Sequence, residues 1–227
     1  MEGDTRLERY IEFKDVRKKY KMGEVEIHAL GGVDFSVNKG EFVIIAGASG
    51  AGKSTILNIL GGMDTVSSGR VIVDNNEISK YSQKDLITYR RDDIGFVFQF
   101  YNLVQNLTAR ENVEVATQIS KNPLNIDKVL HSVGLSDRKN NFPSQLSGGE
   151  QQRVAIARSL STDVDLLFAD EPTGNLNQEM SEEIVKIFKT LAHTHNKCII
   201  MVTHSKEIAD KSDCILTLEK GTLRRNE

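Results

Sequence analysis

Apolar and polar residues form short blocks along the first part of the chain, and their spacing predicts strands. Alternation of the two kinds favours strands over 11–16 and 33–37. The uninterrupted apolar run 42–45 is typical of a strand that is covered on both faces. The same patterns predict further strands at 69–73, 94–98, 164–169, 198–203 and 213–218.

Helices are expected between these strands. Apolar residues predict a buried helix over 54–60 that ends at two glycines. From about 108 to 161 the pattern changes to helix, with capping-box sequences that begin at Thr108 and Ser147. A further amphipathic helix is expected over 179–193. Apolar strands that alternate with helices indicate an α/β fold, a parallel sheet with helices on its faces, here with a helical insertion.

Composition narrows the classes of function. The 227 residues include 39% hydrophobic and 27% charged side chains, which is ordinary for one globular domain. Lys+Arg 29 against Asp+Glu 32 gives a net charge of −3, so no nucleic acid is expected as a partner. The apolar runs are shorter than the roughly 20 residues of a membrane-spanning helix, so we expect this chain not to cross a bilayer.

Residues 47–54 match the phosphate-loop pattern G-x-x-x-x-G-K-S, between an apolar strand and an apolar helix. Glycines let several N–H groups converge on one anion, and the helix N-terminus adds a partial positive charge. We expect Lys53 to reach the β- and γ-phosphates and the Ser54 hydroxyl to bind Mg²⁺. The alternative is a glycine-rich turn without a ligand. The guanine-recognition pattern Asn-Lys-x-Asp is missing from the sequence, so nothing favours GTP. The expected nucleotide contacts in this segment are Gly47, Ser49, Gly50, Ala51, Gly52, Lys53, Ser54 and Thr55.

Two adjacent carboxylates end the strand predicted at 164–169. Ligands collect at the C-terminal edge of a parallel sheet. Asp170 is therefore placed to hold Mg²⁺, through water, and Glu171 to orient or deprotonate an attacking water molecule. A solvated Asp-Glu turn is the alternative. The phosphate loop makes the catalytic interpretation the stronger one, because a site for a nucleotide with Mg²⁺ needs such an acid.

The segment 146–153, LSGGEQQR, resembles the signature motif of ABC-type ATPases. A capping box explains Ser147 and Glu150, but not two glycines in a first helical turn, which cost helix stability. Exposed N–H groups that bind an anion do explain them. Segments 18–24, 89–91, 94–99 and 171–176 resemble the macrolide-exporter and lipoprotein-release type of this family (MacB/LolD-like).

The resemblance covers nearly the whole chain, in the family's motif order. It implies a phosphate-loop (RecA-like) core with a mostly parallel sheet, an N-terminal antiparallel β part and an inserted helical subdomain. Residues 1–227 are then a single ATP-binding domain, with the core at about 1–98 and 162–227 and the helical subdomain at about 99–161.

The resemblance also assigns roles that the residues alone leave open. Tyr20 matches an aromatic residue that stacks on adenine; the alternative is a surface tyrosine at the end of a strand. Gln99 matches a glutamine that contacts Mg²⁺ and senses the γ-phosphate, and His204 a histidine that touches the γ-phosphate. The implied catalytic residues are Lys53, Glu171 and His204, and the implied Mg²⁺ ligands are Ser54, Gln99 and Asp170.

In this family two cassettes pack head to tail, with ATP between the phosphate loop of one copy and Ser147, Gly148 and Gly149 of the other. The resemblance thus implies a homodimeric ATPase at the cytoplasmic face of the membrane that powers a separate permease, with an extracytoplasmic adaptor reached through the permease. The expected cargo is antimicrobial peptides, macrolide-like drugs or lipoproteins, exported or extracted. The alternative is a cell-division-type ATPase with a regulatory or scaffold role.

Two positions depart from the family pattern. Asn177 and Ser205 stand where the family usually has aspartate, and Asn177 puts in doubt the usual contact to the partner's phosphate loop.

One segment is a candidate contact for the permease. The surface near 99–106 is expected to receive a permease helix, with Phe100, Tyr101 and Leu103 as its apolar residues. These three side chains could instead belong to the core.

Overall fold

The computed structural model of this protein describes residues 9–226; the rest of the predicted 1–227 domain lies outside the described residues. The strands are β1 (Arg9–Met22), β2 (Val25–Asn38), β3 (Phe42–Ala46), β4 (Ser68–Val73), β5 (Asn76–Glu77), β6 (Ile94–Phe98), β7 (Leu166–Asp170), β8 (Cys198–Val202), β9 (Cys214–Glu219) and β10 (Thr222–Asn226). The helices are α1 (Lys53–Leu60), α2 (Gln83–Asp92), α3 (Ala109–Thr117), α4 (Ile126–Ser132), α5 (Gly148–Leu160), α6 (Gln178–His195) and α7 (Lys206–Ala209), with 3₁₀ turns η1 (Ile78–Lys80), η2 (Ser136–Arg138) and η3 (Pro143–Gln145).

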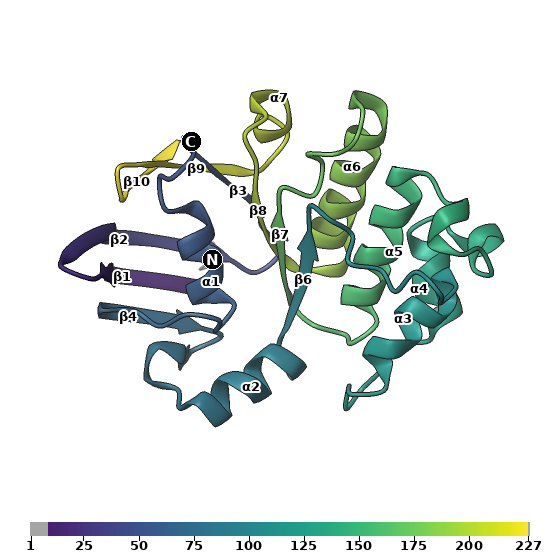
Figure 1. Ribbon diagram of the computed structural model, residues 1–227, viewed down its shortest axis with the longest axis horizontal. Coiled ribbons are helices and arrows are strands. Elements are labelled where there is room, and N and C mark those ends of the chain that lie inside the picture. The colour runs from purple at the N-terminus through teal and green to yellow at the C-terminus, as the bar shows by residue number, and fades with distance from the viewer. Residues whose placement is uncertain (1–8, 227) are drawn as a thin grey trace, which may run out of the picture.

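The strands form two sheets, which confirms the predicted fold class (Figure 1). A four-stranded antiparallel sheet has the order β2-β1-β4-β5. A six-stranded sheet has the order β10-β9-β3-β8-β7-β6, and every neighbouring pair in it is parallel except β10 with β9. Because parallel strands share one direction, β3, β6, β7 and β8 all end at the same edge of the sheet.

The parallel sheet is covered on both faces, as its continuous apolar strands predict. On β3, Val43 and Ile45 face a core that also contains Ile56 and Leu57 of α1 and residues of the antiparallel sheet. Neighbouring Ile44 belongs to a second core formed with α3, α4, α5 and α6. Helix α1 is therefore packed between the two sheets, and Tyr89 of α2 belongs to the same core. Helices α3 to α7 contribute to the core on the opposite face of the parallel sheet (Figure 1).

Several local predictions are confirmed, whereas some elements were missed. Helix α1 ends at Gly61, and both predicted capping boxes form, at Thr108 before α3 and at Ser147 before α5. Helices α2 and α4 and strand β10 were not anticipated individually. Only two residues of α2 are buried, Leu86 and Tyr89, so its apolar periodicity is too sparse to identify it.

Between β6 and β7 the chain is helical, and it is fastened back onto the sheet. The Ser159 hydroxyl of α5 donates to the carbonyl oxygen of Phe96 at 2.6 Å, and Arg158 donates to the carbonyl oxygen of Asn102 at 2.6 Å. These bonds fix the loop that follows β6. The division of the chain into a core and a helical subdomain, at about 99 and 161, stays a prediction. No helix within residues 9–226 has the length and apolar character needed to cross a membrane.

Candidate functional site

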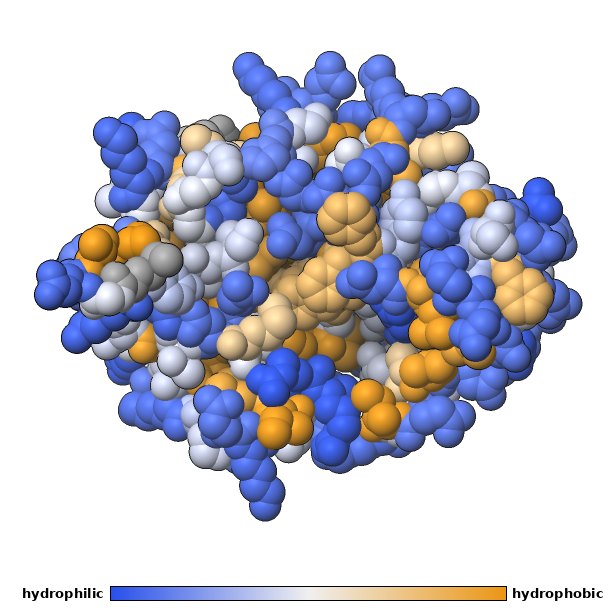
Figure 2. Space-filling model, viewed as in Figure 1, coloured by the Kyte–Doolittle hydropathy of each residue, from blue (hydrophilic) through white to orange (hydrophobic). Residues whose placement is uncertain are grey.

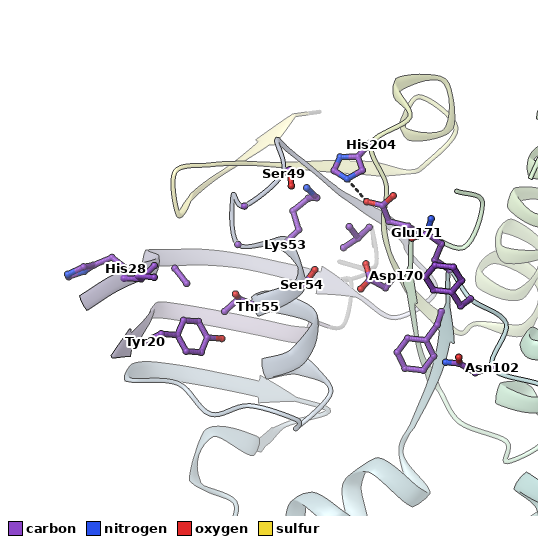
Figure 3. A pocket seen from close by; sticks show the side chains of 18 residues that line it. Tyr20, His28, Ser49, Lys53, Ser54, Thr55, Asn102, Asp170, Glu171 and His204 are labelled. Carbon is purple, nitrogen blue, oxygen red and sulfur yellow. Dashed lines mark ion pairs between the residues drawn. The ribbon is translucent and has the colours of Figure 1, made fainter. Parts of the chain in front are cut away.

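A pocket of about 680 Å³ opens between the antiparallel sheet, the segment 47–55 and the C-terminal edge of the parallel sheet (Figure 3). It gathers segments that are far apart in the sequence. Of the residues singled out from the sequence, those that line it are Tyr20, Ser49, Gly50, Gly52, Lys53, Ser54, Thr55, Gln99, Asp170, Glu171 and His204. Phe100, which the sequence suggested as a permease contact, also lines it, as do Ile27, His28, Ala29, Phe98, Asn102 and Val202, for which the sequence suggested no role.

Two predicted loop residues, Gly47 and Ala51, do not line the pocket. Gly47 has a φ of 152°, and a Cβ there would lie 2.3 Å from the carbonyl oxygen of Leu218 on β9. Gly52 has a φ of 105°, and a Cβ there would lie 2.6 Å from the carbonyl oxygen of Ala29. The glycines therefore let the loop pass close to two neighbouring strands and turn sharply into α1.

Lys53 is the first residue of α1, at the end of this loop, and is only 6% exposed. Its ammonium donates to the carbonyl oxygens of Gly47 and Ala48, at 2.8 and 2.9 Å. Burial lowers the pKa of Lys53, while the carboxylates of Glu171 and Asp170 act in the opposite direction. The loop thus holds a desolvated cation beside the first N–H groups of α1, which is an arrangement suited to a polyanion.

The two carboxylates lie across the pocket from Lys53 (Figure 3). Burial, and then the neighbouring Glu171, raise the pKa of Asp170, whereas Lys53 and His204 lower it. Glu171 has a φ of 47°, an uncommon conformation for a residue with a side chain, and its N–H donates to the carbonyl oxygen of Val202 at 3.0 Å. Its Oε1 lies 2.5 Å from Nε2 of His204. Strained backbone of this kind is often found at functional sites.

Gln99 follows β6 and is held by a residue that the sequence analysis missed. Its Nε2 donates to Oδ1 of Asn175 at 3.3 Å, and Nδ2 of Asn175 donates to the carbonyl oxygen of Gln99 at 3.3 Å. Asn175 lies in the segment 171–176, so its family resemblance was visible, but a contact across 76 residues was not. The pair joins the loop after β6 to the loop after β7.

Tyr20 lies at the opposite end of the pocket from Glu171 (Figure 3). Its hydroxyl donates to Oδ2 of Asp64 at 2.6 Å. Burial, and then the hydrogen bond to Asp64, raise the pKa of this phenol, so it is neutral at physiological pH. A half-buried aromatic ring at one end of an anion-binding pocket is suited to stack on a planar base.

The predicted signature residues Ser147, Gly148 and Gly149 do not line this pocket. They begin α5, where the Ser147 side chain accepts a hydrogen bond from the N–H of Glu150, and Glu150 accepts one from the N–H of Ser147. Ser147 is exposed. The N-terminus of α5 is therefore available to a second molecule, and a single chain does not bring it to its own Lys53.

Both departures from the family pattern occupy helix N-caps. The Asn177 side chain accepts a hydrogen bond from the N–H of Met180 at 2.9 Å and begins α6, and Ser205 accepts one from Ile208 at 3.3 Å and begins α7. Asparagine, serine and aspartate all act as N-caps. The substitutions therefore preserve the local fold while removing two negative charges.

The role of Asn177 as a cap is testable. We expect Asn177→Asp to change the free energy of unfolding by less than about 0.5 kcal/mol, and Asn177→Ala to lower it by about 1 kcal/mol. Urea unfolding of the three proteins measures both changes. Equal losses in the two variants would contradict a capping role.

The segment expected to meet a permease is partly core and partly surface. Phe100 is 69% exposed and Val104 44% exposed, whereas Leu103 is buried in the second core. A separate hollow of about 330 Å³ is lined by Phe100, Tyr101, Leu103 and neighbouring residues. Figure 2 shows apolar side chains gathered across the middle of this face of the molecule, between polar surroundings. Such a patch is typical of an interaction surface.

The comparisons with known proteins all indicate the same family. Residues 30–174 match the sequence profile of the ABC transporter family. The lipoprotein-releasing system ATP-binding protein LolD of Cytophaga hutchinsonii is 45% identical over 214 residues, which are 92% of this chain and 96% of LolD. The macrolide export ATP-binding/permease protein MacB of Brucella melitensis is 38% identical over 218 residues, which are 94% of this chain but 34% of MacB.

The fold has a close counterpart among solved structures. The ATP-binding cassette MJ0796, solved as a dimer in a post-hydrolysis state with ADP and Pi, is 39% identical to this chain, with a TM-score of 0.84. The match covers 96% of this chain and 98% of that protein.

Proposed function

This chain belongs to the ABC transporter family and is an ATPase of that family, and we propose that two copies close head to tail around two ATP molecules to drive a separate membrane permease. One observation carries the proposal. Lys53, Asp170 and Glu171 share one pocket, whereas Ser147 at the start of α5 lies outside it and is exposed. The dimer of the related cassette MJ0796 supports this arrangement.

The pocket orients the triphosphate in one direction. The phosphates bind the N–H groups of the loop and the Lys53 ammonium, and the base lies toward Tyr20. Ser54, Gln99 and Asp170 present the oxygen ligands that Mg²⁺ prefers, so they fit this ion. When bound, Mg²⁺ supplies positive charge that neutralises the phosphate oxygens.

Hydrolysis then needs one activated water molecule in line with the γ-phosphorus. The Glu171 carboxylate accepts the proton of this water as its oxygen attacks, the bond to the β-γ bridging oxygen breaks, and ADP leaves. His204 is paired with Glu171 at 2.5 Å and holds the carboxylate in place. Lys53 stabilises the charge that develops on the phosphate oxygens.

The charge of the γ-phosphate explains why the dimer closes on ATP and opens after hydrolysis. The start of α5 in the second copy contributes the partial positive charge of a helix N-terminus and the N–H groups of its two glycines to the γ-phosphate. ATP therefore favours the closed dimer, while ADP lacks the group that joins the two copies. Two loops joined by Gln99 and Asn175 lie beside the reacting phosphate, next to the exposed Phe100. A permease helix seated at 99–106 would transmit this change to the membrane.

The names of the relatives support the transport role and the class of cargo. LolD is named for lipoprotein release and MacB for macrolide export. We therefore propose that this subunit acts at the cytoplasmic face of the membrane and powers the export or extraction of lipoproteins, macrolide-like drugs or antimicrobial peptides. An extracytoplasmic adaptor joins through the permease.

The head-to-tail arrangement is tested at Ser147. Aspartate is as good an N-cap as serine, so Ser147→Asp keeps α5 intact but places a carboxylate where the partner's γ-phosphate binds. We expect this variant to bind ATP as a monomer with unchanged affinity, and to lose dimerisation and at least about 99% of turnover, a loss of ~2.7 kcal/mol in transition-state stabilisation. Light scattering in Mg-ATP and a phosphate-release assay measure both.

Ser147→Asn is the matched control, because it also caps the helix but is neutral. It should keep most of the dimer and of the turnover. If Ser147→Asp dimerises in Mg-ATP as well as the wild type does, the start of α5 does not face a second nucleotide.

A further inference from the structure

A buried cation lies behind the aromatic ring of the pocket. Lys18 precedes Tyr20 by two residues on β1, so both side chains project from the same face of the strand. Lys18 is only 8% exposed, and its ammonium lies 4.8 Å from the centroid of the Tyr20 ring. A lysine this deeply buried needs partners for its charge.

Those partners come from one turn. The Lys18 ammonium donates to Oδ1 of Asp64 at 2.5 Å and to the carbonyl oxygen of Thr65 at 2.6 Å. The other carboxylate oxygen of Asp64, Oδ2, accepts the hydrogen bond from the Tyr20 hydroxyl. Burial acts to raise the pKa of Asp64, but hydrogen bonds from Lys18, Tyr20 and the Thr65 N–H outweigh it and hold that pKa below its usual range. One ionised carboxylate therefore fixes both the cation and the phenol.

The turn that carries Asp64 is tied to the phosphate loop through α1. The N–H groups of Met63 and Asp64 both donate to the carbonyl oxygen of Asn58, at 2.9 and 3.1 Å, so the turn continues directly from the helix. The other end of this helix begins at Lys53. Figure 3 shows the hydroxyl of Tyr20 directed toward this helix. Eight helical residues span about 12 Å, so one short rigid element sets the offset between the lysine and the ring.

We propose that Lys18 and Asp64 are positioning residues for the nucleobase: they clamp the Tyr20 ring at its hydroxyl and on one face, so that the base stacks on a ring already fixed relative to the phosphates. The inference rests on the proposed function in one respect, that Tyr20 receives the base. A ring held in place loses little freedom when the base binds, which strengthens binding without a direct contact. A clamp that only fastened β1 to α1 would affect every ligand of the pocket alike.

Two ligands separate these cases. Isothermal titration with ATP reports base and phosphate contacts, whereas inorganic tripolyphosphate reports the phosphate contacts alone. We expect Lys18→Met to raise the dissociation constant for ATP by about three- to tenfold, because the ring that receives the base is no longer held, and that for tripolyphosphate by less than about twofold. Lys19→Met is the matched control, because Lys19 pairs with Glu26 instead and should change neither constant.

Two conservative variants extend the test. Lys18→Arg keeps the cation and should restore most of the ATP affinity, and Asp64→Asn should reproduce the ATP-selective loss because it weakens both arms of the clamp. Equal weakening of both ligands, or no change in either, would overturn the proposal. Tyr20→Ala tests the premise of this proposal. If this variant binds ATP as the wild type does, the base is not on Tyr20, and the proposed position of the base is wrong.

Discussion

Glu171→Gln should abolish steady-state hydrolysis while the protein still binds ATP. The side chain keeps its size and its place opposite Lys53, but an amide does not accept the proton of the attacking water. General bases typically contribute 10²–10⁴-fold to rate, so we expect turnover to fall by about 1,000-fold. Phosphate release measures the rate, and binding of a fluorescent ATP analogue measures the affinity.

The same variant should also accumulate as a dimer in Mg-ATP. Without hydrolysis the γ-phosphate stays in place and continues to join the two copies. Glu179→Gln is the matched control, because Glu179 is an exposed glutamate in the first turn of α6 and should behave as wild type. Turnover within threefold of wild type would remove Glu171 from the role of base. A variant that stays monomeric in Mg-ATP would contradict the nucleotide sandwich.

The parts of the fold that sequence predicted are those determined by local chemistry. The apolar runs of β3 and β8 identify strands because both of their faces are buried. The loop before Lys53 is recognisable because its glycines adopt conformations and close approaches that other residues disfavour. Capping boxes at Thr108 and Ser147 are local as well, since they bond within four residues.

The features of the fold and of the site that could not be predicted from the sequence depend on contacts between distant segments. The clamp of Tyr20 by Asp64 joins residues 44 positions apart, and the pairing of Gln99 with Asn175 joins residues 76 apart. Asp64 and Asn175 also lie in polar turns, where such residues are common for reasons unrelated to function. Strand β10 is missed for a similar reason: its polar sequence becomes a strand through pairing with β9.

Lys53→Met should have the second large effect, on binding as well as on turnover. Methionine fills the space of the lysine stem but removes the ammonium that meets the phosphates. It also leaves the carbonyl oxygens of Gly47 and Ala48 without the donor they have here. Loss of one partner from a buried, charged hydrogen-bonded contact costs about 2–5 kcal/mol, so the dissociation constant for ATP should rise by about 30-fold or more.

Lys53→Arg separates charge from shape. If positive charge alone were needed, arginine would restore binding. The ammonium lies within 2.9 Å of two loop carbonyls at 6% exposure, so a planar guanidinium does not fit the same space, and we expect hydrolysis to remain absent. Lys186→Met, on the exposed surface of α6, is the control and should match wild type. Wild-type turnover in Lys53→Met would show that the hydrolysis arises elsewhere, because no other cationic side chain from the described part of this loop lines the pocket.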